Sequence, residues 1–216
     1  MSFALILQQL TGGFMNTLVI FFLTLLFSMP LGLLVAFCRM SGFKPLKWIS
    51  KIFISVLRGT PLMLQLFAVF YGPYFLFKFQ ISTSYRFVAL IIGFAVNYSA
   101  YFAEIYRSGI ESIPIGQYEA ANVLGYNKNQ TFMRIIFPQM VKRVLPPVTN
   151  EVITLVKDTS LAFVLAYTEM FTIAKQIAAA KTTFMPLFVA GVFYFVFNAV
   201  VAFGMETIEK KLSYYR

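Results

Sequence analysis

Apolar residues occur in long runs along this chain, and the runs follow one another from end to end. The first, Phe14 to Phe37, holds 24 uncharged residues. As an α-helix it would be about 36 Å long, enough to cross a hydrocarbon core of about 30 Å. Further uncharged runs are Gly59 to Phe77, Phe87 to Ala103 and Thr182 to Met205, and a weaker apolar run, Val144 to Thr168, contains Glu151, Lys157 and Asp158. The pattern predicts an all-α membrane protein with about five transmembrane helices, roughly 14–37, 52–77, 87–107, 146–168 and 184–205.

The second predicted span has an amphipathic start. Between Lys44 and Arg58, basic and hydroxyl residues recur at helical spacing on one face and apolar residues on the other. We expect this segment to lie at the cytoplasmic interface. A break follows at Arg58-Gly59-Thr60-Pro61, where Thr60 is expected to cap a helix whose first residue is Pro61.

The basic residues give the chain an orientation. With the N-terminus outside and five spans, 12 basic residues lie inside: Arg39, Lys44, Lys47, Lys51, Arg107, Lys128, Arg134, Lys142, Arg143, Lys210, Lys211 and Arg216. Only four lie outside: Lys78, Arg86, Lys175 and Lys181. This asymmetry satisfies the positive-inside rule and predicts an outside N-terminus and an inside C-terminus. Without the fourth span, three basic residues of the tail would lie outside.

Composition narrows the chemistry. Hydrophobic residues make up 59% of the chain and charged residues 12%, against about 25% charged in an ordinary soluble domain. The net charge is +10, and the basic residues that produce it lie at the ends of apolar runs. They therefore indicate how the chain is oriented in a membrane, and not nucleic-acid binding. The chain has no His, and its one Cys, Cys38, excludes an intrachain disulfide and a Cys-based zinc site. We therefore expect no metal site and no catalytic residue.

A long connection, residues 111–143, lies between the third and fourth spans on the cytoplasmic side. Its segment SIPIGQYEAANVLGY, Ser112 to Tyr126, can form a helix that Pro114 opens and that Gly125 ends in the left-handed conformation. Ala120 and Ala121 would give this helix a surface without bulk, which another protein could approach closely. Alternatively, both alanines are there only because alanine favours helix.

Four segments, in this order, carry a resemblance to a known family. They are RGTPLMLQLF (58–67), AYFAEIYRSGIESIPIGQYEAA (100–121), GQYEAANVLGYNKNQTFMRIIFPQ (116–139) and NEVITLVKDTSLAFVL (150–165). The chain resembles the permease subunits of ATP-binding-cassette type I importers, and within them the polar amino-acid uptake branch. The resemblance extends from about residue 10 to the end, so residues 1–216 are interpreted as a single transmembrane permease domain.

The resemblance implies a set of partners. These are a second permease subunit, identical or paralogous, two cytoplasmic ATPase subunits, an external solute-binding protein, an amino-acid substrate and the lipid bilayer of a prokaryotic plasma (inner) membrane. ATP and Mg would be bound by the partner ATPase and not by this chain, which has no GxxxxGK[ST] phosphate-binding loop. The loop residues expected to couple to the ATPase are Gln117, Glu119, Ala120, Ala121 and Gly125.

Polar residues inside the spans form two stripes. Asn97, Tyr101 and Glu104 follow helical spacing in the third span, and Thr154 and Asp158 do so in the fourth. Ionisable groups cost about 2.5–3.5 kcal/mol each at the centre of a membrane helix, so they are expected to face protein or water. We predict that the two stripes line one substrate path. The alternatives are structural roles, in which Glu104 pairs only with Arg107 and Asn97 only bonds one helix to another.

The resulting prediction is a non-enzymatic permease subunit of an ATP-driven importer for a polar amino acid, basic ones included. Basic amino acids are included because the candidate path, apart from Lys157, offers more hydrogen-bond acceptors than donors. The alternatives are a permease for another small solute, an intramembrane carboxylate enzyme that uses Glu104 and Asp158, and a channel or assembly subunit.

Overall fold

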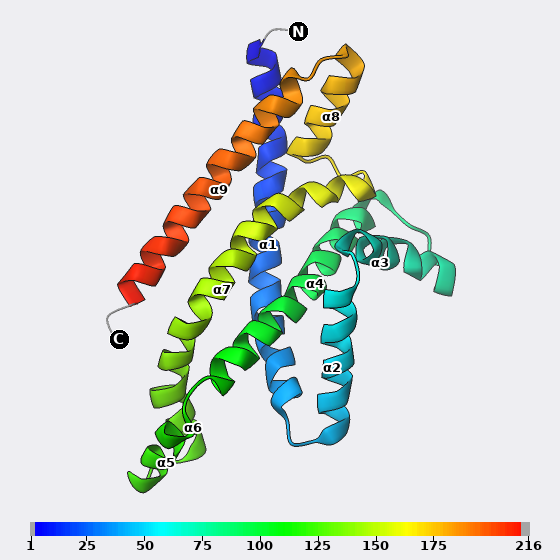
Figure 1. The fold of residues 1–216 in the computed structure, drawn as a ribbon. Helices are drawn as coiled ribbons and strands as arrows, with labels where there is room; N and C mark the ends of the chain where they lie inside the picture. The colour runs from blue at the N-terminus through cyan, green and yellow to red at the C-terminus, as the bar shows by residue number, and fades with distance from the viewer. Residues whose placement is uncertain (1–2, 213–216) are drawn as a thin grey trace.

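The computed structural model describes residues 3–212, and within that range the chain forms helices and connecting segments without strands (Figure 1). The elements are α1 (Phe3–Met40), α2 (Lys44–Gly59), α3 (Leu62–Phe77), α4 (Thr83–Glu111), α5 (Ile115–Val123), α6 (Lys128–Thr131), the π-helix η1 (Phe132–Ile136), α7 (Phe137–Asp158), the 3₁₀-helix η2 (Thr159–Leu165), α8 (Met170–Lys181) and α9 (Met185–Leu212). Arg216, part of the basic tail in the charge count, lies outside the described residues.

The long helices α1 and α4 form the most extensive contact between helices in the molecule. Gly32 of α1 allows their backbones to meet. A Cβ atom at this position would lie 2.7 Å from Cβ of Phe102 and 3.0 Å from the carbonyl oxygen of Ser99. Small residues permit this kind of close approach in membranes, where lipid tails offer no hydrophobic reason for helices to associate.

The predicted second span consists of two helices, α2 and α3, that meet at an angle of 112°. Pro61 explains the break, because proline has no N–H to donate and forces the residue before it into an extended conformation. Thr60 is extended, with φ −122° and ψ 148°. The expected Thr60 cap is wrong. Pro61 itself occupies the N-cap position of α3, and Thr60 Oγ1 donates instead to the carbonyl oxygen of Val56, at 2.8 Å.

The direction of α2 also differs from the expectation of an interfacial helix. A connection of three residues, 41–43, joins it to α1, and α2 then runs back beside the C-terminal part of α1 (Figure 1). It packs against both α1 and α4 and buries Ser50 and Ile54. A helix at the interface would instead lie across the end of the bundle.

Three described helices, α1, α4 and α9, are long and apolar enough to cross a membrane, and the number rises to five if each bent pair is one span. The second bent pair joins 128–165 to α8, with a bend of 58°. At one end of the molecule lie α5 and α6, while the start of α1 and the connection between α8 and α9 lie at the opposite end (Figure 1). The cytoplasmic connection of the prediction thus lies at the same end as the connection between α1 and α2, and the length of the bundle separates it from the connection between α8 and α9 (Figure 1).

Candidate functional site

The predicted coupling helix is α5, and it ends as the sequence predicts. Gly125 has φ +78°, in the left-handed region. Its N–H donates to the carbonyl oxygen of Asn122, and the N–H of Tyr126 donates to that of Ala121, both at 3.0 Å. This pair of bonds is the Schellman motif, which satisfies carbonyl groups at a helix end and turns the chain away.

The outer surface of α5 is partly polar and partly apolar. Gln117, Glu119 and Ala120 are exposed, and so are the large side chains of Ile115 and Val123. Within the described residues, Glu119 makes no ion pair. A protein that docks here would meet an apolar surface around a free carboxylate.

One residue of the predicted coupling surface, Ala121, does not lie on the exposed side of α5. Ala121 is fully buried, so the surface without bulk that both alanines were expected to form consists of Ala120 alone. Neighbouring residues on a helix point about 100° apart and cannot share one face. The half-buried Tyr118 also faces inward, and burial raises the pKa of its phenol above the ordinary value.

The segment around α5 is attached to the ends of α4 and α7. Arg143 of α7 donates to the carbonyl oxygen of Ser112 at 2.5 Å, just beyond the end of α4. A Cβ atom on Gly109 of α4 would lie 2.2 Å from Cγ1 of Val144, so the two helices are in close contact here. The segment that contains α5 is therefore held at its two ends by two helices that contact each other closely.

Of the predicted path residues, Asn97 lies at the break between α2 and α3. It is buried, and its amide donates to Oε1 of Gln65 at 2.9 Å and to the carbonyl oxygen of Leu57 at 3.3 Å. The Gln65 amide in turn donates to Leu57 O at 2.8 Å and to Thr60 Oγ1 at 2.9 Å. These bonds satisfy carbonyl and hydroxyl groups at the end of α2, which gives Asn97 the helix-to-helix role that the sequence left open.

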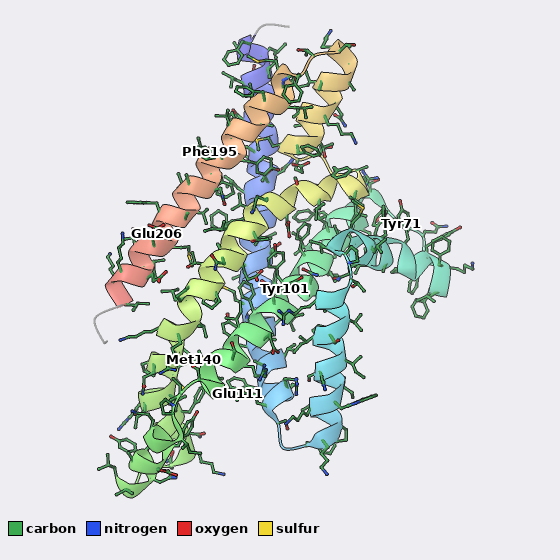
Figure 2. All side chains as sticks on the ribbon, viewed as in Figure 1. Tyr71, Tyr101, Glu111, Met140, Phe195 and Glu206 are labelled. Carbon is green, nitrogen blue, oxygen red and sulfur yellow. The ribbon has the colours of Figure 1, made fainter. Side chains whose placement is uncertain are left out.

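The contact between the two predicted stripes is made by a residue that neither stripe contains. Tyr98, buried on α4, donates to Oδ2 of Asp158 at 2.8 Å. Tyr101, labelled near the middle of α4 in Figure 2, instead lies under the guanidinium of Arg58, whose Cζ is 5.3 Å from the ring centroid. The structure therefore joins α4 to α7 through Tyr98 and Asp158, and to α2 through Tyr101 and Arg58.

The remaining two path residues behave differently from each other. Glu104 forms an ion pair with Arg107, and Arg107 also pairs with Glu111 near the end of α4 (Figure 2). This ion pair is the structural alternative that the sequence left open for Glu104. Thr154 is half-buried and makes no side-chain hydrogen bond within the described residues, which leaves its hydroxyl available.

A further buried carboxylate, Glu169, was not singled out from the sequence. It accepts hydrogen bonds from the backbone N–H groups of Phe171 and Thr172, from the Thr172 hydroxyl and from the Tyr194 hydroxyl. Its side chain thus caps α8 and connects it to α9. The sequence signal for this helix cap was a glutamate three residues before a threonine at the start of a helix. The residues that bury Glu169 lie on α1 and α9, which are distant in sequence, so its burial was not visible from the local sequence.

Metal chemistry has no evident site in residues 3–212. No group of three or more His, Cys, Asp or Glu side chains in this range could hold a metal ion.

Sequence comparisons agree with the geometry. Residues 28–214 match the family described as "Binding-protein-dependent transport system inner membrane component". The chain is similar to the L-cystine transport system permease protein TcyB of Bacillus subtilis (strain 168), with 36% identity over 208 residues, 95% of this chain and 87% of the relative. It is also similar to the arginine transport system permease protein ArtQ of the same organism, with 35% identity over 93% of this chain and 91% of the relative.

Solved structures resemble the fold over almost its full length. The structure described as an amino acid ABC transporter with histidines has a TM-score of 0.87, 30% identity, and coverage of 98% of this chain and 99% of that one. An inward-facing MetNI methionine ABC transporter, 16% identical, has a TM-score of 0.75 over 99% of this chain and 100% of that one, and shows the fold alone. The chain therefore belongs to the binding-protein-dependent permease family of ATP-binding-cassette importers, as an integral inner-membrane transport subunit, with ATP hydrolysis on a separate subunit.

Proposed function

We propose that this chain is the permease through which an importer translocates a polar amino acid, basic ones included, received from an external solute-binding protein. The observation that carries the proposal is the pair of relatives, 36% and 35% identical over more than nine-tenths of this chain, that are named as permeases for L-cystine and arginine. The charged and polar groups that α2, α4 and α7 bring together support it, because a zwitterion needs both donors and acceptors.

The assembly that we propose contains a second permease subunit, identical or paralogous, and two ATPase subunits that bind ATP and Mg. In this assembly α5 docks on an ATPase through Gln117, Glu119 and Ala120, and the turn at Gly125 returns the chain to the membrane. The exposure of these side chains and the attachment of the segment to α4 and α7 support this role.

Reconstitution tests the function directly. The permease, its ATPase and its binding protein are placed in proteoliposomes, and uptake of radiolabelled arginine, glutamine and cystine is measured with and without ATP. We expect uptake of at least one of them that requires both ATP and the binding protein. Uptake that proceeds without the ATPase would indicate a channel. ATP-driven uptake of a different class of solute only would indicate the alternative permease.

We further propose five spans with the N-terminus outside and the C-terminus inside. In this arrangement α2 with α3, and α7 with η2 and α8, each count as one bent span. The excess of basic residues at the end of the molecule that holds α5 supports this orientation under the positive-inside rule.

Cysteine labelling checks the orientation. In a background in which Cys38 is replaced by serine, a cysteine at Lys175 should react with a membrane-impermeant maleimide in sealed cells, and a cysteine at Lys128 should not. Both native side chains are exposed, so burial does not explain the difference. The Lys128 cysteine should react once the membrane is opened. Labelling of that position in sealed cells would contradict the topology.

We propose that the substrate path lies near mid-membrane, between Asn97, Tyr101 and Glu104 on α4 and Thr154 and Asp158 on α7. Packing of α4 against α7 and the bond between Tyr98 and Asp158 support it. So does the high cost of ionisable groups in a membrane, which favours their placement against water or a ligand.

Ligand competition tests this path. Asp158→Asn keeps an acceptor for Tyr98 but removes a negative charge, so uptake of arginine should fall about tenfold relative to glutamine, the size of one charge-assisted bond. Asn97→Ala should also change the relative uptake of competing amino acids. The matched control is Glu206→Gln, which makes the same chemical change at an exposed site on α9 (Figure 2). An unchanged ligand ranking in Asp158→Asn and Asn97→Ala, with normal assembly, would mean that the stripes are structural.

A further inference from the structure

A polar pocket lies where the end of α4 meets α7. It has a volume of about 530 Å³ and is lined by Ser108, Gly109, Ser112 and Arg143. This volume lies within the range of about 300–1,000 Å³ that is usual for small-molecule sites. Beside the pocket, the close contact of Gly109 with Val144 holds the two helices together. The pocket therefore lies where the connection 111–143 leaves α4 and returns to α7.

Arg143 brings to this pocket a positive charge that no ion pair neutralises. Both ion pairs among the described residues belong to Arg107, with Glu104 and Glu111. One N–H of Arg143 Nη1 donates to the carbonyl oxygen of Ser112, at 2.5 Å. A guanidinium has five N–H groups in a planar fork, so others remain to bind an anion, and their spacing matches two oxygens of a phosphate.

The two serines of the pocket add hydrogen-bond acceptors. Ser108 Oγ donates to the carbonyl oxygen of Ile105, at 2.9 Å. Ser112 Oγ donates to that of Gly109, at 2.7 Å. A hydroxyl group has one donor and two acceptor positions, so both oxygens can still accept a hydrogen bond from a ligand. A phosphate that carries a hydroxyl-bearing group, as in the headgroup of phosphatidylglycerol, offers the complementary set.

The depth of the pocket favours a lipid over a soluble anion. Ser108 and Ser112 follow residue 107, where the third predicted span ends, by one and five positions. Along a helix these positions lie about 1.5–7.5 Å beyond the hydrocarbon core. The headgroup layer on each side of the core is about 5–7 Å thick, so phospholipid phosphates lie at the level of the pocket. Basic pockets between membrane helices on the cytoplasmic side are known to bind lipid headgroups.

We propose that this pocket binds the phosphate of an anionic phospholipid. The guanidinium of Arg143 contacts the phosphate oxygens, and Ser108 and Ser112 accept hydrogen bonds from the rest of the headgroup. The lipid stabilises the junction of α4 and α7 to which the segment containing α5 is attached. Its placement in the inner leaflet rests on the proposed orientation, whereas the pocket lies at a membrane interface in either orientation.

The test uses the complete complex of permease and ATPase subunits in nanodiscs of phosphatidylcholine, with and without phosphatidylglycerol. Thermal unfolding is measured in both mixtures, and native mass spectrometry identifies the lipids that stay bound. We expect phosphatidylglycerol to raise the unfolding temperature of the wild type. It should also be retained about 10- to 100-fold over phosphatidylcholine, the usual range for a charge-assisted bond. Arg143→Gln should abolish both effects, and Arg143→Lys should keep part of them, because the charge remains.

Arg143→Gln also removes the bond to Ser112, so the comparison between the two lipid mixtures decides the result. A purely structural role would lower the unfolding temperature equally in both mixtures, whereas the proposal predicts that the difference between them disappears. Ser108→Leu obstructs the pocket without touching that bond and should abolish the difference as well. The matched control is Lys128→Gln, which removes an exposed cation from α6 at the same end of the molecule and should keep the difference.

A difference that persists in Arg143→Gln and Ser108→Leu, or that is lost in Lys128→Gln, would overturn the site. Inorganic phosphate added to the phosphatidylcholine nanodiscs should not raise the unfolding temperature. If it does so in the wild type and not in Arg143→Gln, the pocket binds a soluble anion and the lipid assignment is wrong. These outcomes leave the transported substrate undecided, because the uptake assay tests it separately.

Discussion

Replacement of Gly125 by valine is expected to uncouple ATP hydrolysis from transport, with uptake reduced at least about tenfold, while the protein still inserts. The φ of Gly125 is +78°, where a β-branched residue is strongly disfavoured, at a cost of about 1–2 kcal/mol or more. A Cβ atom at this position has open space around it, so the effect acts through the backbone turn and not through a clash. Loss of the turn would release the end of α5 from its fixed direction.

Proteoliposomes provide the measurement, with uptake and the stimulation of ATPase activity by the binding protein recorded together. Gly125→Asn is the matched control, because asparagine tolerates the left-handed conformation better than other non-glycine residues. It should retain most of the activity. Glu119→Lys, which reverses an exposed charge without touching the turn, should uncouple as well. Normal transport and normal ATPase stimulation in Gly125→Val would show that the segment has no coupling role.

Glu169→Ala is expected to destabilise the protein by about 2–4 kcal/mol, because it removes both a helix cap and the acceptor for buried donors. Four hydrogen bonds end on this carboxylate, which is fully buried. Without it, the N–H groups of Phe171 and Thr172 and the hydroxyl of Tyr194 lose their partner. The junction of α8 with α9 should therefore open first.

Thermal unfolding followed by size-exclusion chromatography measures this loss in detergent. Glu169→Gln retains one acceptor oxygen and should be destabilised less than Glu169→Ala. Glu206→Ala removes an exposed carboxylate from α9 and should unfold at the wild-type temperature. A Glu169→Ala variant as stable as the wild type would mean that water or lipid replaces the four bonds without cost.

The position of α4 connects these separate features. It packs against α1, α2, α3 and α7, and its end leads directly into α5. Along it lie Asn97, which bonds to the break in the second span, then Tyr98, which bonds to α7, and Tyr101, which lies beneath Arg58. A movement of α5 at one end would therefore reach all three contacts through one continuous helix.

The sequence alone predicted the all-helical class, the family and the left-handed turn at Gly125, and the structure and the comparisons confirm all three. It also predicted a chain break beside Pro61. Each of these depends on information that is local in the chain. Runs of apolar residues indicate which segments transfer favourably into lipid. Glycine permits the left-handed backbone and proline restricts the backbone, each at its own position.

Tertiary structure alone decided what the polar groups contact. The sequence placed Asn97 and Asp158 on facing stripes, yet Asn97 bonds to Gln65 and Asp158 to Tyr98. Helical spacing fixes which residues share a face, but the rotation of each helix about its axis decides what that face meets. That rotation is set here by contacts between distant segments, such as Gly32 against Phe102.

The same reason explains the remaining differences. A proline predicts a break but not its angle, and the break of 112° between α2 and α3 is spanned by bonds from Gln65 and Asn97 to the carbonyl oxygen of Leu57. Ala121 is buried and Ala120 exposed because the neighbouring segments cover only one side of α5. Local sequence thus determined which segments are helices and where they end, while packing between segments far apart in the chain determined which side chains meet.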